Sequence, residues 1–219
     1  MMQQQATAHF NMLEQQVRPS EVLDPRVLSA LSVVDRADFV DESLAGLAYA
    51  DTDLPIGFGQ VVLSPVLQGR LLQALNVQPD EHVLEIGTGS GYFTALLAQL
   101  AHHVTSIEIV SELSALAANN LADAGIENIT LIVDDASQSC LLNDRVDVII
   151  STAAFVTMPD AYLQSINVGG RIVAIVGKKQ IMTVQQITRI SERDWQTQTL
   201  FETVVPEMIN AEAKPVFEF

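Results

Sequence analysis

The residues with the clearest chemical potential lie in one short stretch, Val83-Leu84-Glu85-Ile86-Gly87-Thr88-Gly89-Ser90-Gly91-Tyr92. An apolar run that ends in an acid, followed by a glycine at every second position, predicts a strand, a tight turn and the start of a helix. Such a turn brings backbone N–H groups close to a bound nucleotide cofactor. The contacts expected from this stretch are Glu85, Gly87, Thr88, Gly89, Ser90, Gly91 and Tyr92.

Two positions in this stretch distinguish between cofactors. The dinucleotide fingerprint G-x-G-x-x-G has its third glycine where this chain has Tyr92, and the carboxylate of Glu85 would repel a pyrophosphate. S-adenosyl-L-methionine carries an ammonium and a sulfonium, so an acid suits it, and its own carboxylate can meet the N–H groups of the turn. The stretch therefore favours S-adenosyl-L-methionine, with S-adenosyl-L-homocysteine as the product, and leaves an NAD-dependent oxidoreductase as a remote alternative.

Acidic residues also end the next two predicted strands. Glu108 ends the second strand, where a carboxylate commonly accepts hydrogen bonds from ribose hydroxyls, and Asp134-Asp135 end the third, near the expected adenine edge. Three strand-end acids in succession are a sharper signal than the glycine turn alone. An ordinary loop-edge carboxylate is the alternative at each position, most of all at Asp134, whose neighbour can serve as well. The predicted cofactor site is completed by Ile109, Ala136 and Thr152.

The elements that must position these residues alternate between strand and helix. Predicted strands cover residues 81–86, 103–108, 129–133, 146–151 and 171–176, with helices at about 91–100, at 111–124 and after Pro159, the last closed by Gly169-Gly170. Such alternation predicts a parallel sheet with helices on both faces. Only residues 177–180 precede the next β-like run at 181–190, too few for a parallel crossover. That run and a further one at 195–202 should form an antiparallel pair at one edge of a mostly parallel, seven-stranded α/β sheet.

The start of the chain carries helical patterns of its own. Phe10, Leu13 and Val17 predict one apolar face of a short helix, which Pro19 stops. A capping residue before proline is a typical helix start. This signature occurs twice, at Asp24-Pro25 and at Ser64-Pro65.

A long irregular stretch at residues 48–60 precedes the cofactor motif and combines Gly, Pro and Asp with aromatic residues. Such a stretch is typical of a binding loop, and a packed connector is an equal alternative. We expect residues 1–75 to form a helical, substrate-side segment packed on a cofactor-binding core of residues 76–219, in one globular unit. The end of the core, 216–219, should be a short docked segment.

Composition narrows the class of protein and its partners. The chain has 219 residues with 27 acidic and 11 basic side chains, and a net charge of -16 repels phosphate backbones, so no nucleic-acid partner is expected. No run approaches the length of a membrane span, and residues 1–5 lack the layout of a signal peptide. The single cysteine, Cys140, allows no intrachain disulfide and reads as a small filler residue. We expect a cytoplasmic protein without a membrane contact, and the histidines lack the spacing of metal ligands.

Several segments beyond single motifs point to one known family. They are Val27–Leu31, Val34–Val40, Ala48-Tyr49-Ala50-Asp51, Leu54-Pro55-Ile56-Gly57 and Gly59-Gln60, followed downstream by Asp147–Ala154 and Gly169-Gly170-Arg171. The glycine motif itself continues as Thr94-Ala95-Leu96-Leu97-Ala98. With these segments, the chain resembles the protein-L-isoaspartate O-methyltransferases, a family with the class I, Rossmann-like methyltransferase fold, over roughly residues 20–180. Many methyltransferases share the glycine motif, so the upstream segments make the resemblance specific.

This resemblance implies methyl transfer from S-adenosyl-L-methionine to the α-carboxyl of an L-isoaspartyl residue, which marks damaged proteins for repair. The partner would be a protein or peptide that carries such a residue, and a monomer or a dimer is equally compatible. Substrate contacts would come from Tyr49, Ile56, Gly57 and Gln60, with Asp51 and Ser64 in the catalytic region.

Two departures from the family pattern are visible. The family continues Gly-Gln with Thr-Ile-Ser-x-Pro, whereas this chain has Val61-Val62-Leu63-Ser64-Pro65, which places Leu63 where the active-site hydroxyl belongs. The family's Gly-Asp-Gly after the third strand is Asp134-Asp135-Ala136, which keeps the adenine-side acid. The first departure leaves an alternative open, in which the protein binds S-adenosyl-L-methionine but uses another acceptor or lacks isoaspartyl activity.

Overall fold

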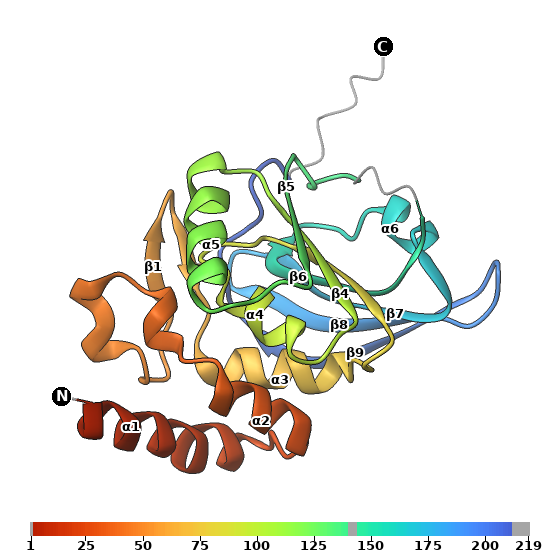
Figure 1. Ribbon diagram of the computed structural model, residues 1–219. Helices are drawn as coiled ribbons and strands as arrows, with labels where there is room; N and C mark the ends of the chain where they lie inside the picture. Colours follow the sequence, from red (N-terminus) through yellow and green to blue (C-terminus); the bar gives the residue numbers. More distant parts are fainter. Residues whose placement is uncertain (1, 140–143, 212–219) are drawn as a thin grey trace.

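A computed structural model describes residues 2–139 and 144–211 of the chain. Cys140 and the segment 216–219, both of which carried sequence predictions, lie outside these residues. The described chain contains a seven-stranded sheet of order β5-β4-β3-β6-β7-β8-β9 and a separate two-stranded hairpin, β1-β2. Figure 1 shows the sheet in the middle of the molecule, with α1, α2 and α3 gathered along one side.

The large sheet confirms the predicted architecture. Neighbouring strands are parallel from β5 through β4, β3 and β6 to β7, and β8 and β9 are antiparallel additions at one edge. The connection between β7 and β8 is a hairpin in which Lys178 pairs with Ile181, which is why no crossover helix fits there. The strands are β3 His82–Ile86, β4 His103–Glu108, β5 Ile129–Val133, β6 Val146–Phe155, β7 Ile166–Lys178, β8 Ile181–Arg189 and β9 Trp195–Thr203.

Each face of the sheet buries its own hydrophobic cluster. Val83 in β3 belongs to the larger cluster, with residues of the N-terminal segment, whereas Leu84 and Ile86 belong to the other. This division follows from the two-residue period of a strand, which sends alternate side chains to opposite faces. The larger cluster is covered by α3 Pro65–Leu75, α4 Tyr92–Ala98 and α5 Ser111–Asp123, and α6 Asp160–Gln164 lies against the opposite cluster through Tyr162.

The N-terminal segment contributes directly to the larger cluster. It comprises α1 Met2–Asn11, the π-helical turn η1 Met12–Val17, the 3-10 turn η2 Arg18–Ser20, α2 Pro25–Val33 and the 3-10 turns η3 Arg36–Phe39 and η4 Glu42–Leu47. Asp24 caps α2 as predicted, because its carboxylate accepts the N–H of Arg26. The helix buries Val27, Leu28 and Leu31 in the larger cluster.

The predicted face of the first helix was wrong at Phe10. Phe10 is 61% exposed, whereas Met12 and Val17 are fully buried. The reason is the π-helical turn over Met12–Val17, in which residues five apart share a face. A pattern search based on α-helical spacing therefore selects the wrong residue.

The prediction that Gly169-Gly170 closes a helix was also wrong. Helix α6 ends at Gln164, and both glycines lie inside β7, which begins at Ile166. The pairing of β7 with β6 is irregular there, and a side chain at Gly170 would place its Cβ 2.6 Å from the carbonyl oxygen of Asp147. The glycine is needed for this close approach of two strands.

Strand β6 extends four residues beyond the predicted end at Ser151, to Phe155. Its added part pairs with the chain after β9. The N–H of Ala154 donates to the carbonyl of Pro206, and the N–H of Met208 donates back to Ala154. This contact brings residues 206–211 across the carboxyl edge of the sheet. No helix within the described residues is long and apolar enough to cross a membrane.

Candidate active site

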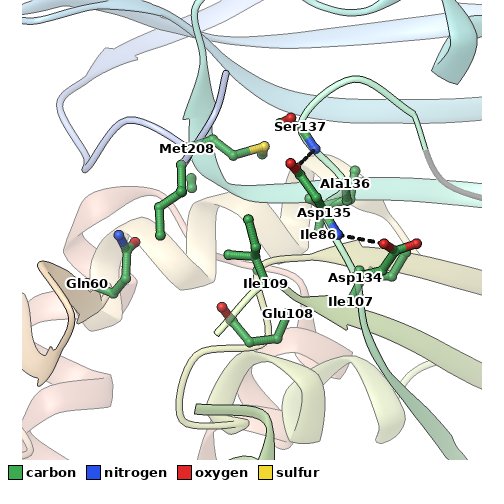
Figure 2. Close-up of a pocket in the computed structure, with 13 residues that line it drawn as sticks. Gln60, Ile86, Ile107, Glu108, Ile109, Asp134, Asp135, Ala136, Ser137 and Met208 are labelled. Carbon is green, nitrogen blue, oxygen red and sulfur yellow. Dashed lines mark hydrogen bonds between the residues drawn. The ribbon is translucent and has the colours of Figure 1, made fainter. Parts of the chain in front are cut away.

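Three adjoining hollows form one cleft at the carboxyl ends of the central strands. Gly87 lines all three, and Gln60, Glu108 and Thr152 each line two of them. Figure 2 shows the first hollow, with Gln60 on one side, Asp134 and Asp135 on the other, and Glu108 and Ile109 between them. Its lining is Gln60, Ile86, Gly87, Ile107, Glu108, Ile109, Asp134, Asp135, Ala136, Ser137, Ala153, Met208 and Ile209.

The glycine turn forms the floor of the cleft. Gly87, Gly89 and Gly91 all have positive φ values, of 98°, 56° and 87°. A Cβ on Gly87 would lie 2.6 Å from the Oγ1 of Thr152, whose hydroxyl donates to the carbonyl of Gly87 at 2.7 Å. The turn therefore requires glycine both for its backbone conformation and for its contact with β6.

Glu108 reaches the cleft from the end of β4. Its carboxylate accepts the N–H of Gly89 at 2.9 Å through one oxygen and the N–H of Val110 at 3.0 Å through the other. These bonds fix the side chain beside the glycine turn, and each oxygen keeps a further acceptor position for a ligand. Glu108 thus lines the cleft at the end of β4, where the sequence placed it, and its contact with a ribose stays a prediction.

Asp135 lies at the opposite wall, after β5. One oxygen of its carboxylate accepts the N–H of Ser137 at 2.9 Å, and the other accepts the side-chain N–H of Asn210 at 2.9 Å. The N–H of Asp135 itself donates to Asp134, as the dashed line in Figure 2 shows. The predicted pair Asp135 and Ala136 thus lines the cleft, and Asn210 ties the segment after β9 to this wall.

Glu85 occupies a different position from the one that the sequence suggested. Its side chain is fully buried and lies outside the three lining sets of the cleft. Period-two alternation explains this, because Glu85 faces the same side as Val83, where the hydroxyl of Thr94 in α4 donates to it at 2.5 Å. Burial raises the pKa of Glu85 to about 8, and the nearby Glu108 adds to the shift. A neutral carboxyl below the turn cannot hold an ammonium in the way that we expected from sequence.

A further side of the cleft is formed by the hairpin of β1 Leu54–Gly57 and β2 Gln60–Val62. Ile56, Gln60 and Leu63, all three expected in the site from sequence, line the cleft there, and their contacts with a substrate stay predictions. Gly57 faces a separate hollow between the hairpin and α5. Leu63 is 3% exposed, so an apolar side chain stands where the sequence comparison placed a hydroxyl. The surrounding hollow also contains Thr88, Ser90 and Tyr92.

Three residues predicted for the substrate side lie behind the cleft, where they hold the loop in place. The carboxylate of Asp51 accepts the N–H of Val66 at 3.1 Å, in the first turn of α3. Ser64 is the N-cap residue of α3, but its hydroxyl makes no capping bond and its N–H donates to Asp53 instead. The hydroxyl of Tyr49 donates to Asp35 at 2.6 Å, and its ring stacks on His9.

Several lining residues were missed by the sequence analysis. Ser137 and Ala153 each follow a predicted site residue, Ala136 and Thr152, so extending each predicted site segment by one residue would have found them. Gln68 is 2% exposed on α3 and carried no signal of its own. Met208 and Ile209 reach the cleft only because the chain returns to β6, which no local pattern reveals. Within the described residues, no group of His, Cys, Asp and Glu could hold a metal ion.

Comparison with known proteins identifies similar chains along almost the whole length. The sequence pattern of the protein-L-isoaspartate(D-aspartate) O-methyltransferase family (PCMT) matches residues 7–208. A protein-L-isoaspartate O-methyltransferase from Syntrophus aciditrophicus is 39% identical over 183 residues, 84% of either chain. One from Serratia proteamaculans is 40% identical over 174 residues, 80% of this chain and 83% of that one.

Solved structures show the same fold. A putative protein-L-isoaspartate O-methyltransferase from Plasmodium falciparum, in complex with S-adenosyl-L-homocysteine, superposes with a TM-score of 0.80. It is 19% identical and covers 91% of this chain and 97% of its own. At this level of identity, the likeness speaks for the arrangement of strands and helices alone.

Proposed function

The chain belongs to the protein-L-isoaspartate(D-aspartate) O-methyltransferase family, and from that membership we propose that it methylates the free carboxyl group of L-isoaspartyl residues in damaged proteins. The methyl donor is S-adenosyl-L-methionine, and S-adenosyl-L-homocysteine is the product. The observation that carries the proposal is the cleft itself. It joins a nucleoside-type wall at the ends of β3, β4 and β5 to a peptide-side hairpin through shared lining residues.

The lining fits the cofactor. Apolar walls of Ile107, Ile109 and Met208 suit the faces of a purine, and Asp135 supplies an acceptor at its edge. Glu108 has acceptor capacity left for two ribose hydroxyls after its bonds to the turn. The turn brings backbone N–H groups, rather than a charged side chain, to the amino-acid part of the cofactor. When bound, the cofactor supplies a methyl group activated by a positively charged sulfur.

The chain has little acid–base work to do in this reaction. The acceptor carboxyl of an isoaspartyl residue is ionised at neutral pH, so it needs no general base. What the protein contributes is alignment of the carboxylate with the methyl group and exclusion of water, which together account for large rate gains. We assign alignment on the acceptor side to Ile56 and Gln60, and exclusion of water on the cofactor side to Met208 and Ile209.

Leu63 changes how the acceptor is held. A buried leucine cannot donate a hydrogen bond to a carboxylate, so the donor must come from another group. The side chain of Gln60 lines both the cofactor hollow and the adjoining one, which makes it the best-placed donor. A methyltransferase with a less polar acceptor is the second candidate, and the apolar surface of Leu63 is the observation that favours it.

We also propose how the chain is divided and where it works. Residues 1–75 supply the acceptor side, and residues 76–219 form the cofactor-binding core. A single cysteine in 219 residues favours the reducing cytoplasm over an oxidising compartment. The net charge of -16 favours a protein or peptide substrate over nucleic acid.

Two measurements test the proposal. Calorimetry with S-adenosyl-L-homocysteine should give a binding isotherm, and NAD should give none; the reverse result would remove the cofactor assignment. Methyl transfer should then be followed on an isoaspartyl peptide and on the same peptide with a normal aspartyl residue. Transfer to the isoaspartyl peptide alone supports the proposal, whereas cofactor binding without transfer to either peptide supports the second candidate.

A further inference from the structure

Arg36 is a fully buried cation behind the acceptor side of the cleft. It begins the 3-10 turn η3, and 0% of its surface is exposed. Its guanidinium donates to four backbone carbonyls, those of Ala48 at 2.7 Å, Thr52 at 3.3 Å, Val62 at 3.3 Å and Leu63 at 2.9 Å. A buried arginine is costly unless hydrogen bonds satisfy it. These bonds satisfy its two terminal nitrogens, while the buried Nε has no hydrogen-bond partner among the described residues.

The four carbonyls flank the β1-β2 hairpin on both sides. Ala48 and Thr52 precede β1, whereas Val62 and Leu63 are the last residue of β2 and the one that follows. The strands have only four and three residues, and a two-stranded ribbon of this size is not stable by itself. The two terminal nitrogens of the guanidinium carry four N–H donors and reach all four carbonyls, whereas the ammonium of a lysine has three donors on a single nitrogen.

Three neighbouring aspartates also hold the residues that flank the β1-β2 hairpin, which form its base. Asp35 accepts the hydroxyl of Tyr49 at 2.6 Å, next to the carbonyl of Ala48. Asp53 accepts the N–H of Ser64 at 2.7 Å, and Asp51 accepts that of Val66 at 3.1 Å, which ties the loop to the start of α3. The base of the hairpin is therefore anchored to η3 and to α3, while its tip at Phe58 is 57% exposed.

The anchored hairpin reaches the cofactor side of the cleft. A Cβ on Gly89 would lie 3.2 Å from the Cδ1 of Ile56, so the hairpin packs directly on the glycine turn. Gln60 extends from the same hairpin into the hollow that contains Glu108. A shift at the base would thus move both of these side chains relative to the turn.

We propose that Arg36 is a positioning residue for the acceptor side of the site, which acts by bonding both ends of the β1-β2 hairpin so that Ile56, Gln60 and Leu63 keep their places against the glycine turn. The inference rests on the proposed function for the identity of the acceptor. Its structural part, the order of the hairpin, does not depend on that function.

The test compares Arg36→Met and Arg36→Lys with wild type and with Arg26→Met. Arg26 is the matched control, because it also bonds a carbonyl, that of Val77 at 2.9 Å, but it ties α2 to the segment after α3. Amide hydrogen exchange within residues 48–63 should become roughly tenfold faster in both Arg36 variants and stay unchanged in the control. The KM for an isoaspartyl peptide should rise about tenfold in both Arg36 variants, with a smaller change in kcat, because misplaced contacts weaken acceptor binding.

Each result has a defined meaning. Unchanged exchange in residues 48–63 of the Arg36 variants, or equally faster exchange in Arg26→Met, overturns the inference. If Arg36→Lys keeps both the slow amide exchange of residues 48–63 and the wild-type KM, the assigned role of the guanidinium fork is overturned. Where Arg36→Met does not fold, Arg36→Lys alone decides whether Arg36 positions the hairpin. If wild type does not methylate the peptide, the proposed function fails, while the exchange comparison still decides the role of Arg36.

Discussion

Replacing Glu108 with alanine should weaken binding of S-adenosyl-L-homocysteine by about 1–3 kcal/mol, or about 5- to 150-fold in Kd. The magnitude follows from the bonding of its carboxylate. Both oxygens are held by backbone N–H groups, of Gly89 and of Val110, so the side chain is already oriented for ribose hydroxyls. Hydrogen bonds to a charged acceptor contribute roughly 1.5–3 kcal/mol each, and water that enters the vacated space recovers part of this.

The assay is calorimetric titration of wild type, Glu108→Ala, Glu108→Gln and Glu112→Ala, each with its melting temperature. Glu112 in the first turn of α5 is a matched control, because its removal changes the net charge equally and it lies outside the lining of the cleft. Glu108→Gln keeps one acceptor and should lose less affinity than the alanine variant. Equal affinity of Glu108→Ala and Glu112→Ala, at similar melting temperatures, would refute the assignment of Glu108 to the ribose.

Three further outcomes follow from other contacts. Because burial raises the pKa of Glu85 from 4.5 to about 8, the folded state holds a proton that the unfolded state has lost, so the free energy of unfolding should fall as pH rises from 4.5 to 8. Glu85→Gln should flatten that decline in denaturant titrations, and an unaltered slope would contradict the buried, neutral carboxyl. Leu63→Ser should increase kcat/KM for an isoaspartyl peptide. It should also lower the free energy of unfolding by about 2–4 kcal/mol, because apolar burial is lost. A wild type that is already fully active, with no gain in the variant, would show that residue 63 is not decisive. Asn210→Ala removes the hydrogen bond to Asp135 at 2.9 Å. Release of S-adenosyl-L-homocysteine should then become a few-fold faster in stopped-flow measurements. An unchanged release rate would show that the segment after β9 does not restrain the ligand.

Most of the sheet could be predicted because its central strands contain apolar runs separated by clear helix and turn signals. The antiparallel return of β8 was predicted from a single physical limit, since residues 177–180 are too few to cross a sheet. What failed were features that depend on unusual local geometry. The π-helical turn moved Phe10 to the surface, and the close approach of β6 and β7 placed Gly169-Gly170 inside a strand. Neither is visible in periodicity, because each departs from the standard repeat.

The site was predictable where a residue lies at the end of a strand. Gly87, Glu108 and Asp135 follow from the rule that parallel strands present ligands at their carboxyl edge. Met208, Gln68 and Arg36 could not be found in this way, because their contacts depend on segments far away in the chain. Asp51 and Ser64 were assigned from the family resemblance, which identifies a segment but does not say which of its side chains face the ligand.

Glu85 and Glu108 show how a shared sequence signal leads to different chemistry. Both are glutamates near the ends of neighbouring parallel strands, and both were expected to contact the cofactor. Glu85 is followed by one more strand residue, Ile86, and therefore points back beneath α4. Full burial raises its pKa to about 8 there, against the opposing hydrogen bonds from the hydroxyls of Thr94 and Ser106. Glu108 is the last residue of its strand and meets two N–H groups at the open edge of the cleft. A strand-end acid should therefore be assigned to a ligand only after its face of the sheet has been worked out. By that criterion, we expect the cofactor to meet Glu108 and Asp135 in this cleft, while Glu85 bonds Thr94 of α4 beneath the turn.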